Sequence, residues 1–283
     1  MKSSSRSETI GIRKLPELTR EQFDAIRGLV HQVAGITIAD GKEKMVQTRL
    51  ARRVRTLGLS DFDAYLEYLE RDTTGRELSE LVDALTTNKT AFFREPQHFA
   101  FLREAVLPEL AARGRPMSFW SAGCSSGEEA YTLAMVARDA VPSCDALGVR
   151  ILATDISARM LRIAREAVYP ESAVADVPEP YRSRYFRRVP GQATPMYRVG
   201  DEVRRMVRIA RLNLLDHWPM RGPFDVIFCR NVMIYFDHAT QERLVRRFHS
   251  LLAPGGYLCV GHSESLGSLS HAFRFVRPAI YRK

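Results

Sequence analysis

The spacing of hydrophobic residues changes near residue 90, and this change predicts two parts of different architecture. In the first part, apolar residues recur every three to four positions, which is the period of an amphipathic helix. Thr19 and Gln22 have the spacing of a capping box, which marks the start of the first helix. Three more helices are expected, beginning at Lys42, after Ser60 and at Gly75. The pattern therefore predicts an all-helical N-terminal domain at residues 19–87.

From Pro116 onward, short apolar strands alternate with amphipathic helices. Strands are expected at 116–122, 149–154, 206–212, 224–229, 256–262, 273–276 and 279–282, and helices at 127–140, 157–168 and 238–252. Such alternation predicts an α/β domain whose mostly parallel sheet is covered on both faces. The last two strands, joined by Arg277 and Pro278, are expected to form an antiparallel edge. Between residues 170 and 204 the alternation lapses, which predicts a small inserted β-subdomain.

These patterns give a provisional domain plan for the 283 residues. Residues 1–18 are polar and are expected to be a disordered tail. Residues 88–115 are expected to form a linker and a helix bordering the main site, and residues 116–283 form the α/β domain with its insertion. Either domain is large enough to bury a hydrophobic core.

Composition indicates a soluble globular protein, because hydrophobic residues make up 45% of the chain and its mean hydropathy is −0.21. The polar start lacks the apolar core of a signal peptide, so we expect a cytoplasmic protein without membrane insertion. The four cysteines show no C-x-x-C spacing, and the seven histidines are scattered along the chain. We therefore expect reduced packing cysteines and no metal site.

The net charge of +9 and the pI near 9.6 suggest an acidic partner. The excess lies in two patches: residues 42–55 carry six basic residues against one acidic residue, and residues 182–211 carry nine arginines against two acidic residues. A single basic helix is usually only a solvated face. Two such patches in one chain favour an acidic macromolecular partner over that interpretation.

The segment from Phe119 to Asp155 has the pattern of a nucleoside-binding half-site. A strand breaks into a turn of small residues that includes Gly123, a helix follows directly, and the next strand ends in Asp155. Glycine lets the backbone approach a ligand, and a carboxylate at a strand end can bind two ribose hydroxyls. Ser125 replaces the second glycine of the dinucleotide pattern, and the acidic residues at 128–129 would repel a pyrophosphate. A ligand with a ribose and no phosphate, such as S-adenosylmethionine (SAM), fits better than a dinucleotide; the alternative is an ordinary strand-turn-helix.

Two further segments carry polar residues where ligands bind in α/β sheets. Residues 86–96 (TTNKTAFFREP) place hydroxyls, an amide and an arginine at the junction between the domains. The strand at 224–229 is followed by Arg230, Asn231 and Tyr235, at the carboxyl end where such sheets bind ligands. The alternatives are a linker anchored by its phenylalanines for the first segment, and capping and core packing for the second.

Taken together, these motifs resemble those of the CheR-type chemotaxis methyltransferases. The resemblance runs from Thr19 to Tyr281 and is carried by TNKTAFFRE, SAGCSSGEEAYTLAM, ILATDIS, FCRNVMIYFD and LLAPGGYLCVGHSESL. It implies a SAM-dependent methyltransferase fold with a helical N-terminal domain and an inserted β-subdomain. It also implies methyl transfer from SAM to glutamate side chains of bacterial chemoreceptors, forming glutamyl methyl esters for chemotactic adaptation.

The resemblance assigns site residues at matching positions of this sequence. Contacts to SAM are expected from Asn88, Thr90, Arg94, Glu128, Asp155, Asn213, Leu214, Arg230 and Asn231, in addition to Gly123 of the half-site. The acidic contact is assigned to Glu128, with Glu129 as the open alternative. Arg94 and Tyr235 are the residues that the family associates with the reacting centre.

The expected chemistry needs no general base, because a glutamate side chain with a pKa near 4.3 is already ionised at neutral pH. Arg94 would position the carboxylate, and Tyr235 would form the wall beside the sulfur and the methyl group. Two alternatives remain: a SAM-dependent methyltransferase of RNA or a small molecule, and a SAM-binding or receptor-binding module without catalysis. No familiar RNA-binding motif accompanies the basic patches, so no nucleic acid partner is expected.

Partners are expected on both basic patches. The apolar stripe of the helix at 42–55 would leave Arg49, Arg52, Arg53 and Arg55 turned outward, toward acidic methylation helices of a receptor bundle. The inserted subdomain is a candidate site for a receptor C-terminal peptide. The protein is expected to be a monomer.

Overall fold

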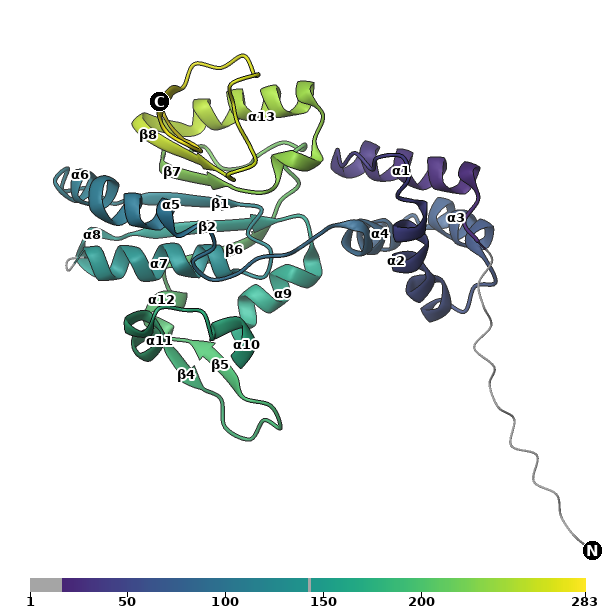
Figure 1. Ribbon diagram of the computed structural model, residues 1–283, viewed down its shortest axis with the longest axis horizontal. Helices are drawn as coiled ribbons and strands as arrows, with labels where there is room; N and C mark the ends of the chain where they lie inside the picture. Colours follow the sequence, from purple (N-terminus) through teal and green to yellow (C-terminus); the bar gives the residue numbers. More distant parts are fainter. Residues whose placement is uncertain (1–16, 142–143) are drawn as a thin grey trace, which may run out of the picture. The chain divides into compact units, whose positions relative to one another are not determined.

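A computed structural model describes residues 17–141 and 144–283, and the predicted tail at 1–18 lies almost entirely outside the described residues. The chain divides into two compact units (Figure 1). The first comprises the described residues up to Leu29 together with Ile38–Leu85, and the second comprises Val30–Thr37 and Thr86–Lys283.

The first unit is helical, as the periodicity predicted. Its helices are α1 (Arg20–Ala34), whose last turn belongs to the second unit, α2 (Glu43–Thr56), α3 (Phe62–Arg71) and α4 (Arg76–Leu85). The predicted capping box is present: the Thr19 N–H donates to Gln22 Oε1 at 2.9 Å, and the Gln22 N–H donates to Thr19 Oγ1 at 3.2 Å. We expected Ser60 to cap the third helix, but the cap of α3 is the next residue: the side chain of Asp61 accepts the Ala64 N–H at 2.9 Å.

The second unit is built on a seven-stranded sheet with the order β6-β2-β1-β7-β8-β10-β9. The strands are β1 (Ser118–Ala122), β2 (Arg150–Asp155), β6 (Val207–Arg211), β7 (Phe224–Cys229), β8 (Leu252–Val260), β9 (Arg274–Arg277) and β10 (Ile280–Arg282). The first five in this order are parallel neighbours, whereas β10 pairs antiparallel with both β8 and β9. The predicted parallel sheet with an antiparallel edge is confirmed.

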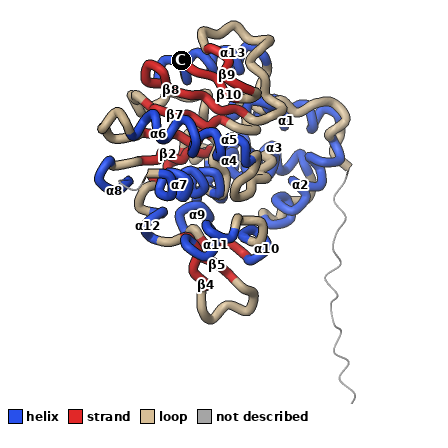
Figure 2. The backbone as a smooth tube through the Cα atoms, turned by 60° about the vertical axis from the view of Figure 1, so that its left-hand side comes forward, coloured by secondary structure: helices blue, strands red, loops and turns tan. Residues whose placement is uncertain are grey.

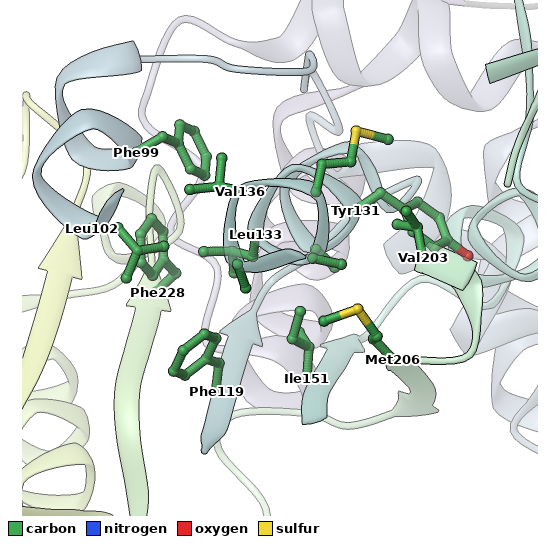
Figure 3. Close-up of a cluster of buried hydrophobic side chains, with 14 of the residues drawn as sticks. Phe99, Leu102, Phe119, Tyr131, Leu133, Val136, Ile151, Val203, Met206 and Phe228 are labelled. Atoms are coloured by element: carbon green, nitrogen blue, oxygen red, sulfur yellow. The ribbon is translucent and has the colours of Figure 1, made fainter. Parts of the chain in front are cut away.

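Helices cover both faces of this sheet because successive side chains of each strand point to opposite faces. Outside the insertion, the helical segments of this unit include α5 (Pro96–Phe101), the π-helix η1 (Leu102–Val106), α6 (Leu107–Ala111), α7 (Glu128–Ala140), α8 (Cys144–Leu147), α9 (Ala158–Glu166) and α13 (His238–Leu251). Figure 3 shows Phe119 of β1 close to Leu133 of α7, and Val136 of the same helix beside Phe99 of α5. The next residue of β1, Trp120, packs against Phe248 of α13 on the other face.

The predicted insertion forms a separate three-stranded antiparallel sheet in the order β3-β5-β4. Its elements are β3 (Val168–Pro170), α10 (Glu171–Val174), α11 (Glu179–Tyr185), β4 (Phe186–Arg188), β5 (Met196–Val199) and α12 (Asp201–Arg204). Figure 2 shows β4 and β5 apart from the strands of the main sheet. The ring of Phe92 packs edge-on against Tyr169 and Phe186, so the insertion rests on the segment that precedes α5.

In the part of the chain that the structure describes, no helix has the length and apolar character needed to cross a membrane.

Candidate active site

Most of the predicted site residues come together at one edge of the main sheet. Strands β6, β2, β1 and β7 are parallel neighbours, so their carboxyl ends meet at the same edge. Asn213 follows β6, Asp155 ends β2, Gly123 follows β1, and Arg230 follows β7. Four segments that are far apart in sequence therefore contribute to one site.

Gly123 sits in a turn that only glycine fits. The N–H groups of Gly123 and Cys124 both donate to the Thr154 carbonyl, at 2.8 and 2.9 Å, which holds the turn against β2. Gly123 has φ of +88°, and a Cβ atom at this position would collide with the side chain of Val232. Glycine is therefore required here both by the backbone conformation and by the packing of Val232. Burial raises the pKa of the neighbouring Cys124 thiol, which argues against a nucleophilic cysteine.

Asp155 ties the two predicted binding loops together. Its buried carboxylate accepts the Ser125 N–H at 2.8 Å and the Ser157 N–H at 2.9 Å. The Ser125 hydroxyl donates to the Asn88 carbonyl at 3.0 Å, which fixes the segment at 86–96 against the same turn. A carboxylate has about four acceptor positions, so these backbone bonds are compatible with ribose hydroxyls binding to the same group.

The adjacent acidic residues of α7 point to different surroundings. Both carboxylate oxygens of Glu128 lie within hydrogen-bond distance of the Ser126 hydroxyl, at 3.0 and 2.7 Å. Glu129 accepts the Ser121 hydroxyl at 2.7 Å, and its other oxygen lies 3.4 Å from Arg230 Nη1. Burial raises the pKa of both carboxyls, and for Glu129 the positive charge of Arg230 opposes that rise. Glu129 therefore faces the end of β7, whereas the Glu128 carboxylate contacts Ser126 in the turn that precedes α7.

Arg230 is the buried centre of the site. Its Nη2 donates to the Arg94 carbonyl at 2.5 Å and lies 3.2 Å from Glu95 Oε2. The guanidinium carbon lies 5.4 Å from the ring centre of Phe99 and 5.7 Å from that of Phe228, within cation–π range. Arg230 thus connects the end of β7 to the segment that carries Arg94.

Arg94 and Tyr235, the two predicted residues of the reacting centre, are held by the same short segment. Arg94 Nη1 donates to the Lys89 carbonyl at 2.8 Å, and the Tyr235 hydroxyl lies 3.5 Å from the Thr87 carbonyl. Tyr235 lies in the 3-10 helix η2 (Met233–Tyr235), and its own carbonyl accepts the Thr37 N–H at 2.8 Å. Both side chains are partly exposed, so they remain accessible to a substrate.

The side chains of Asn213 and Leu214 are engaged in hydrogen bonds and in core packing, respectively. The Asn213 amide donates to the Val33 carbonyl at 2.7 Å, and its oxygen accepts the Leu215 N–H at 3.1 Å. The side chain of Leu214 is buried in the core cluster that includes Trp218. Thr90, by contrast, is half-buried in the segment that precedes α5. Because the side chains of Asn213 and Leu214 are engaged, contacts from these two residues to a ligand would come from their backbone.

Glu264 is a site residue that the sequence reasoning missed. Its buried carboxylate accepts three backbone N–H groups: Asn231 at 2.7 Å, Gly261 at 2.6 Å and Ile234 at 3.1 Å. These bonds fix the turn after β7 in which Asn231 has φ of +59°. The signal available in the sequence was an acidic residue directly after a buried strand, within the motif GHSES.

The structure corrects the prediction for the basic helix α2 in the first unit. Its apolar stripe is buried as expected, and Arg52 and Arg55 are exposed. Arg53, however, forms a two-pronged ion pair with the buried carboxylate of Glu77. Arg49 donates to the Leu85 carbonyl at 2.8 Å. Both side chains are only half exposed because they complete the packing of α2 against α4.

Histidines that are distant in sequence also meet near the site. No metal site was predicted, but Glu95, His98 and His262 place one ligand atom each within 4.8 Å of one another. Scattering along the sequence was therefore a poor guide to their positions in the fold.

Two family models match consecutive parts of the chain. The all-alpha domain of CheR methyltransferases matches residues 21–86, and the SAM-binding domain of CheR methyltransferases matches residues 88–281. The site residues at the sheet edge lie within the second match. Val33 and Thr37, whose backbone groups contact Asn213 and Tyr235, lie within the first.

Individual relatives match over nearly the full chain. Chemotaxis protein methyltransferase 2 of Pseudomonas aeruginosa is 40% identical over 282 residues, covering 99% of both chains. The chemotaxis protein methyltransferase of Escherichia coli K12 is 40% identical over 265 residues, covering 93% of this chain and 91% of that protein. A solved SAM-dependent methyltransferase from Mesorhizobium loti is 18% identical with a TM-score of 0.31, covering 55% of this chain and 50% of that chain. At this sequence identity and TM-score, the likeness to the solved structure carries no information on activity.

Proposed function

This chain belongs to the CheR methyltransferase family, and we propose from this membership that it methylates glutamate side chains of bacterial chemoreceptors. The family match makes it a SAM-dependent methyltransferase. The product would be a glutamyl methyl ester. One observation most directly supports the assignment of Arg94 and Tyr235 to one reacting centre. Both side chains contact backbone carbonyls of the same short segment, residues 87–89.

The residues at the sheet edge fit SAM. The turn at Gly123 packs against Val232 without a side chain of its own, and the Asp155 carboxylate ends the neighbouring strand β2, where a carboxylate can bind ribose hydroxyls. The acidic start of α7 disfavours a phosphate-bearing cofactor, because a carboxylate repels a phosphate at the helix terminus. Bound SAM would supply an electrophilic methyl group on a positively charged sulfur. We propose that Asn88, Thr90, Arg94, Asp155, Arg230 and Asn231 hold it with their side chains or backbone, and Asn213 and Leu214 with their backbone.

Of the two acidic residues of α7, we now assign the cofactor contact to Glu129 in preference to Glu128. Glu129 faces the carboxyl end of β7 through its contacts with Ser121 and Arg230. Glu128 turns its carboxylate onto the Ser126 hydroxyl at the other side of the turn. A cation such as an ammonium group or a sulfonium would be stabilised by the Glu129 side of the site.

The chain's own residues then have defined tasks in the reaction. The receptor glutamate is ionised at neutral pH, so no residue has to remove a proton. Arg94, partly exposed and anchored at the Lys89 carbonyl, can orient that carboxylate by hydrogen bonds from its remaining N–H groups. Tyr235 forms a wall that limits water at the reacting atoms, and orientation of the reactants lowers the barrier to methyl transfer.

The receptor would be bound partly by charge. Arg52 and Arg55 are exposed on α2, so we propose that these two residues, rather than Arg53 and Arg49, attract acidic methylation helices of a receptor bundle. Exposed pairs of this kind contribute about 0–1 kcal/mol each and weaken with salt. The strands β3 and β4 are the outer strands of the inserted sheet, and we propose that a receptor C-terminal peptide could pair with one of them.

We further propose that the protein acts as a monomer in the cytoplasm. All four cysteines are buried and unpaired, as is typical of proteins in a reducing compartment.

Alkali treatment of labelled products tests the proposal. Purified protein is incubated with methyl-labelled SAM and membranes that contain chemoreceptors, and the product is treated with alkali. Glutamyl methyl esters release volatile methanol, whereas N-methyl and ribose-methyl products keep the label. Volatile label that depends on receptor and disappears in Asp155→Asn supports the proposal. Alkali-stable label, or label that appears with RNA and not with receptor, contradicts it.

A further inference from the structure

Glu95, His98 and His262 form a cluster beside Arg230 that the proposed methyl transfer does not use. Glu95 is the N-cap of α5, His98 lies in α5, and His262 follows β8, so two segments that are far apart in sequence meet here. Glu95 Oε2 lies 3.7 Å from His98 Nδ1 and 3.9 Å from His262 Nε2. The two imidazole rings are 5.1 Å apart and nearly perpendicular.

His98 is the feature that requires an explanation. Its side chain is 1% exposed, and neither ring nitrogen has a hydrogen-bond partner among the described residues. Glu95 Oε2 is also buried; it has an ion-pair contact with Arg230 at 3.2 Å but no hydrogen bond among those residues. Buried polar atoms are almost always satisfied, and an ion is one of the few partners that can satisfy a carboxylate and an imidazole together.

We propose that Glu95, His98 and His262 bind a divalent transition metal of the Zn²⁺ type. Two imidazoles and one carboxylate are a donor set that suits Zn²⁺, with the fourth position open to water. Zinc bonds of about 2.0–2.2 Å place neighbouring ligand atoms roughly 3.3 Å apart. The carboxylate-to-imidazole distances are therefore within about half an ångström of what a metal requires.

Local charge is compatible with a cation. Arg230 is positive, but it contacts two carboxylates, Glu95 at 3.2 Å and Glu129 at 3.4 Å. A third carboxylate, Glu264, binds the N–H of Gly261, the residue before His262. Glu95 Oε2 retains a second lone pair beside its contact with Arg230, so one oxygen can serve both cations.

His262 provides a route for the metal, because its side chain is 46% exposed while His98 is enclosed. A bound metal would join the segment that carries Arg94 to the end of β8. It would therefore stiffen the wall of the methyl-transfer site without contacting the substrate itself.

Metal binding to the untagged full-length protein tests the site. Zn²⁺ affinity is measured by calorimetry, and Co²⁺ gives a visible spectrum that reports the ligand geometry. The informative variant is His262→Gln, whose half-exposed side chain can change without disturbing the core; His217→Gln, an exposed histidine elsewhere in the same unit, is the matched control. We expect one Zn²⁺ per chain, an affinity at least about tenfold weaker in His262→Gln, and no change in His217→Gln.

Thermal unfolding with and without Zn²⁺ distinguishes loss of the metal site from misfolding of the variant. Zn²⁺ should raise the melting temperature of the wild type and of His217→Gln, because it binds the folded state, and at the same Zn²⁺ concentration should raise that of His262→Gln distinctly less. Absence of a stoichiometric metal in the wild type, or equal affinity in both variants, would overturn the proposal. Neither readout depends on methyl transfer, so this proposal and the proposed function can fail separately.

Discussion

The buried carboxylate of Glu264 accepts the backbone N–H of Asn231 at 2.7 Å and thereby fixes the turn that follows β7. The two residues are 33 positions apart, and the same carboxylate also binds the N–H groups of Gly261 and Ile234. A single side chain thus holds in place the turn that leads to Tyr235. Glu264 is a positioning residue, since it acts on the site through the backbone.

Glu264→Gln is expected to reduce turnover and stability together. The amide loses the negative charge that three N–H groups share, and its NH₂ group faces a donor if it keeps the same orientation. Hydrogen bonds to a charged group contribute about 1.5–3 kcal/mol, so we expect a loss of free energy of unfolding of about that size. Denaturant titration and the SAM dependence of the rate measure both effects. The exposed Glu166→Gln is the control, and equal behaviour of the two variants would contradict the role of Glu264.

Asp155→Asn is expected to weaken SAM binding by about ten- to a hundredfold. The substitution turns an NH₂ group toward either Ser125 or Ser157, whose N–H groups bind the carboxylate now. It also removes a charged acceptor, at a cost of about 1.5–3 kcal/mol. Calorimetry on the folded variant measures the affinity, with the exposed Asp145→Asn as control. An unchanged SAM affinity in folded Asp155→Asn would rule out the ribose-binding role.

Tyr235→Phe and Arg94→Ala should lower turnover far more than stability. The Tyr235 hydroxyl is 3.5 Å from its acceptor, and the Arg94 side chain is anchored by its hydrogen bond to the Lys89 carbonyl, so each removal costs the fold about 1 kcal/mol or less. Turnover at saturating receptor and the melting temperature are compared for each variant. Tyr197→Phe, which loses a hydroxyl bond to Glu171 at 3.2 Å on the inserted sheet, is the matched control. A parallel loss of stability and activity would favour a packing role.

The exposed and paired arginines of α2 should behave differently. Arg52→Glu combined with Arg55→Glu should raise the apparent KM for receptor and leave SAM affinity intact, and added salt should slow the wild type more than this variant. Arg53→Ala should instead destabilise the protein by about 3 kcal/mol, because it leaves the buried Glu77 carboxylate without its charge partner. Receptor titrations at two ionic strengths and thermal unfolding separate the effects. Normal KM in the double variant at low salt would make α2 a solvated face.

Gly123→Ala should abolish SAM binding or the fold of the turn, because the new Cβ would collide with Val232 while φ stays at +88°. Gly191→Ala separates the two causes, since Gly191 also has positive φ but has open space around its Cβ position. Backbone strain alone costs about 1–2 kcal/mol, so Gly191→Ala should lose some stability and keep SAM affinity. Equal SAM affinity in the two variants would show that the close approach at Gly123 is unimportant.

Several features follow from the sequence by itself. The spacing of apolar residues predicted the helices of the first unit and the alternating strands and helices of the second. An element that buries one face must repeat its apolar residues with the period of a helix or of a strand. The convergence of Asp155 with Arg230 also followed, since parallel strands place their carboxyl ends at one edge. The capping box at Thr19 was predictable because its two bonds span three residues.

Pairings between distant segments were decided only by the tertiary structure. Arg53 lies on the expected polar face of its helix, yet it forms an ion pair with Glu77 of another helix. Its charge is therefore neutralised and is not part of the exposed basic surface. Glu129 rather than Glu128 faces Arg230, although both stand at the same helix start. Periodicity records which face of an element is buried, whereas the partner of a buried charge depends on how elements far apart in sequence pack side by side. The sequence therefore determined the fold and the edge that bears the site, and packing determined which charged side chains meet there.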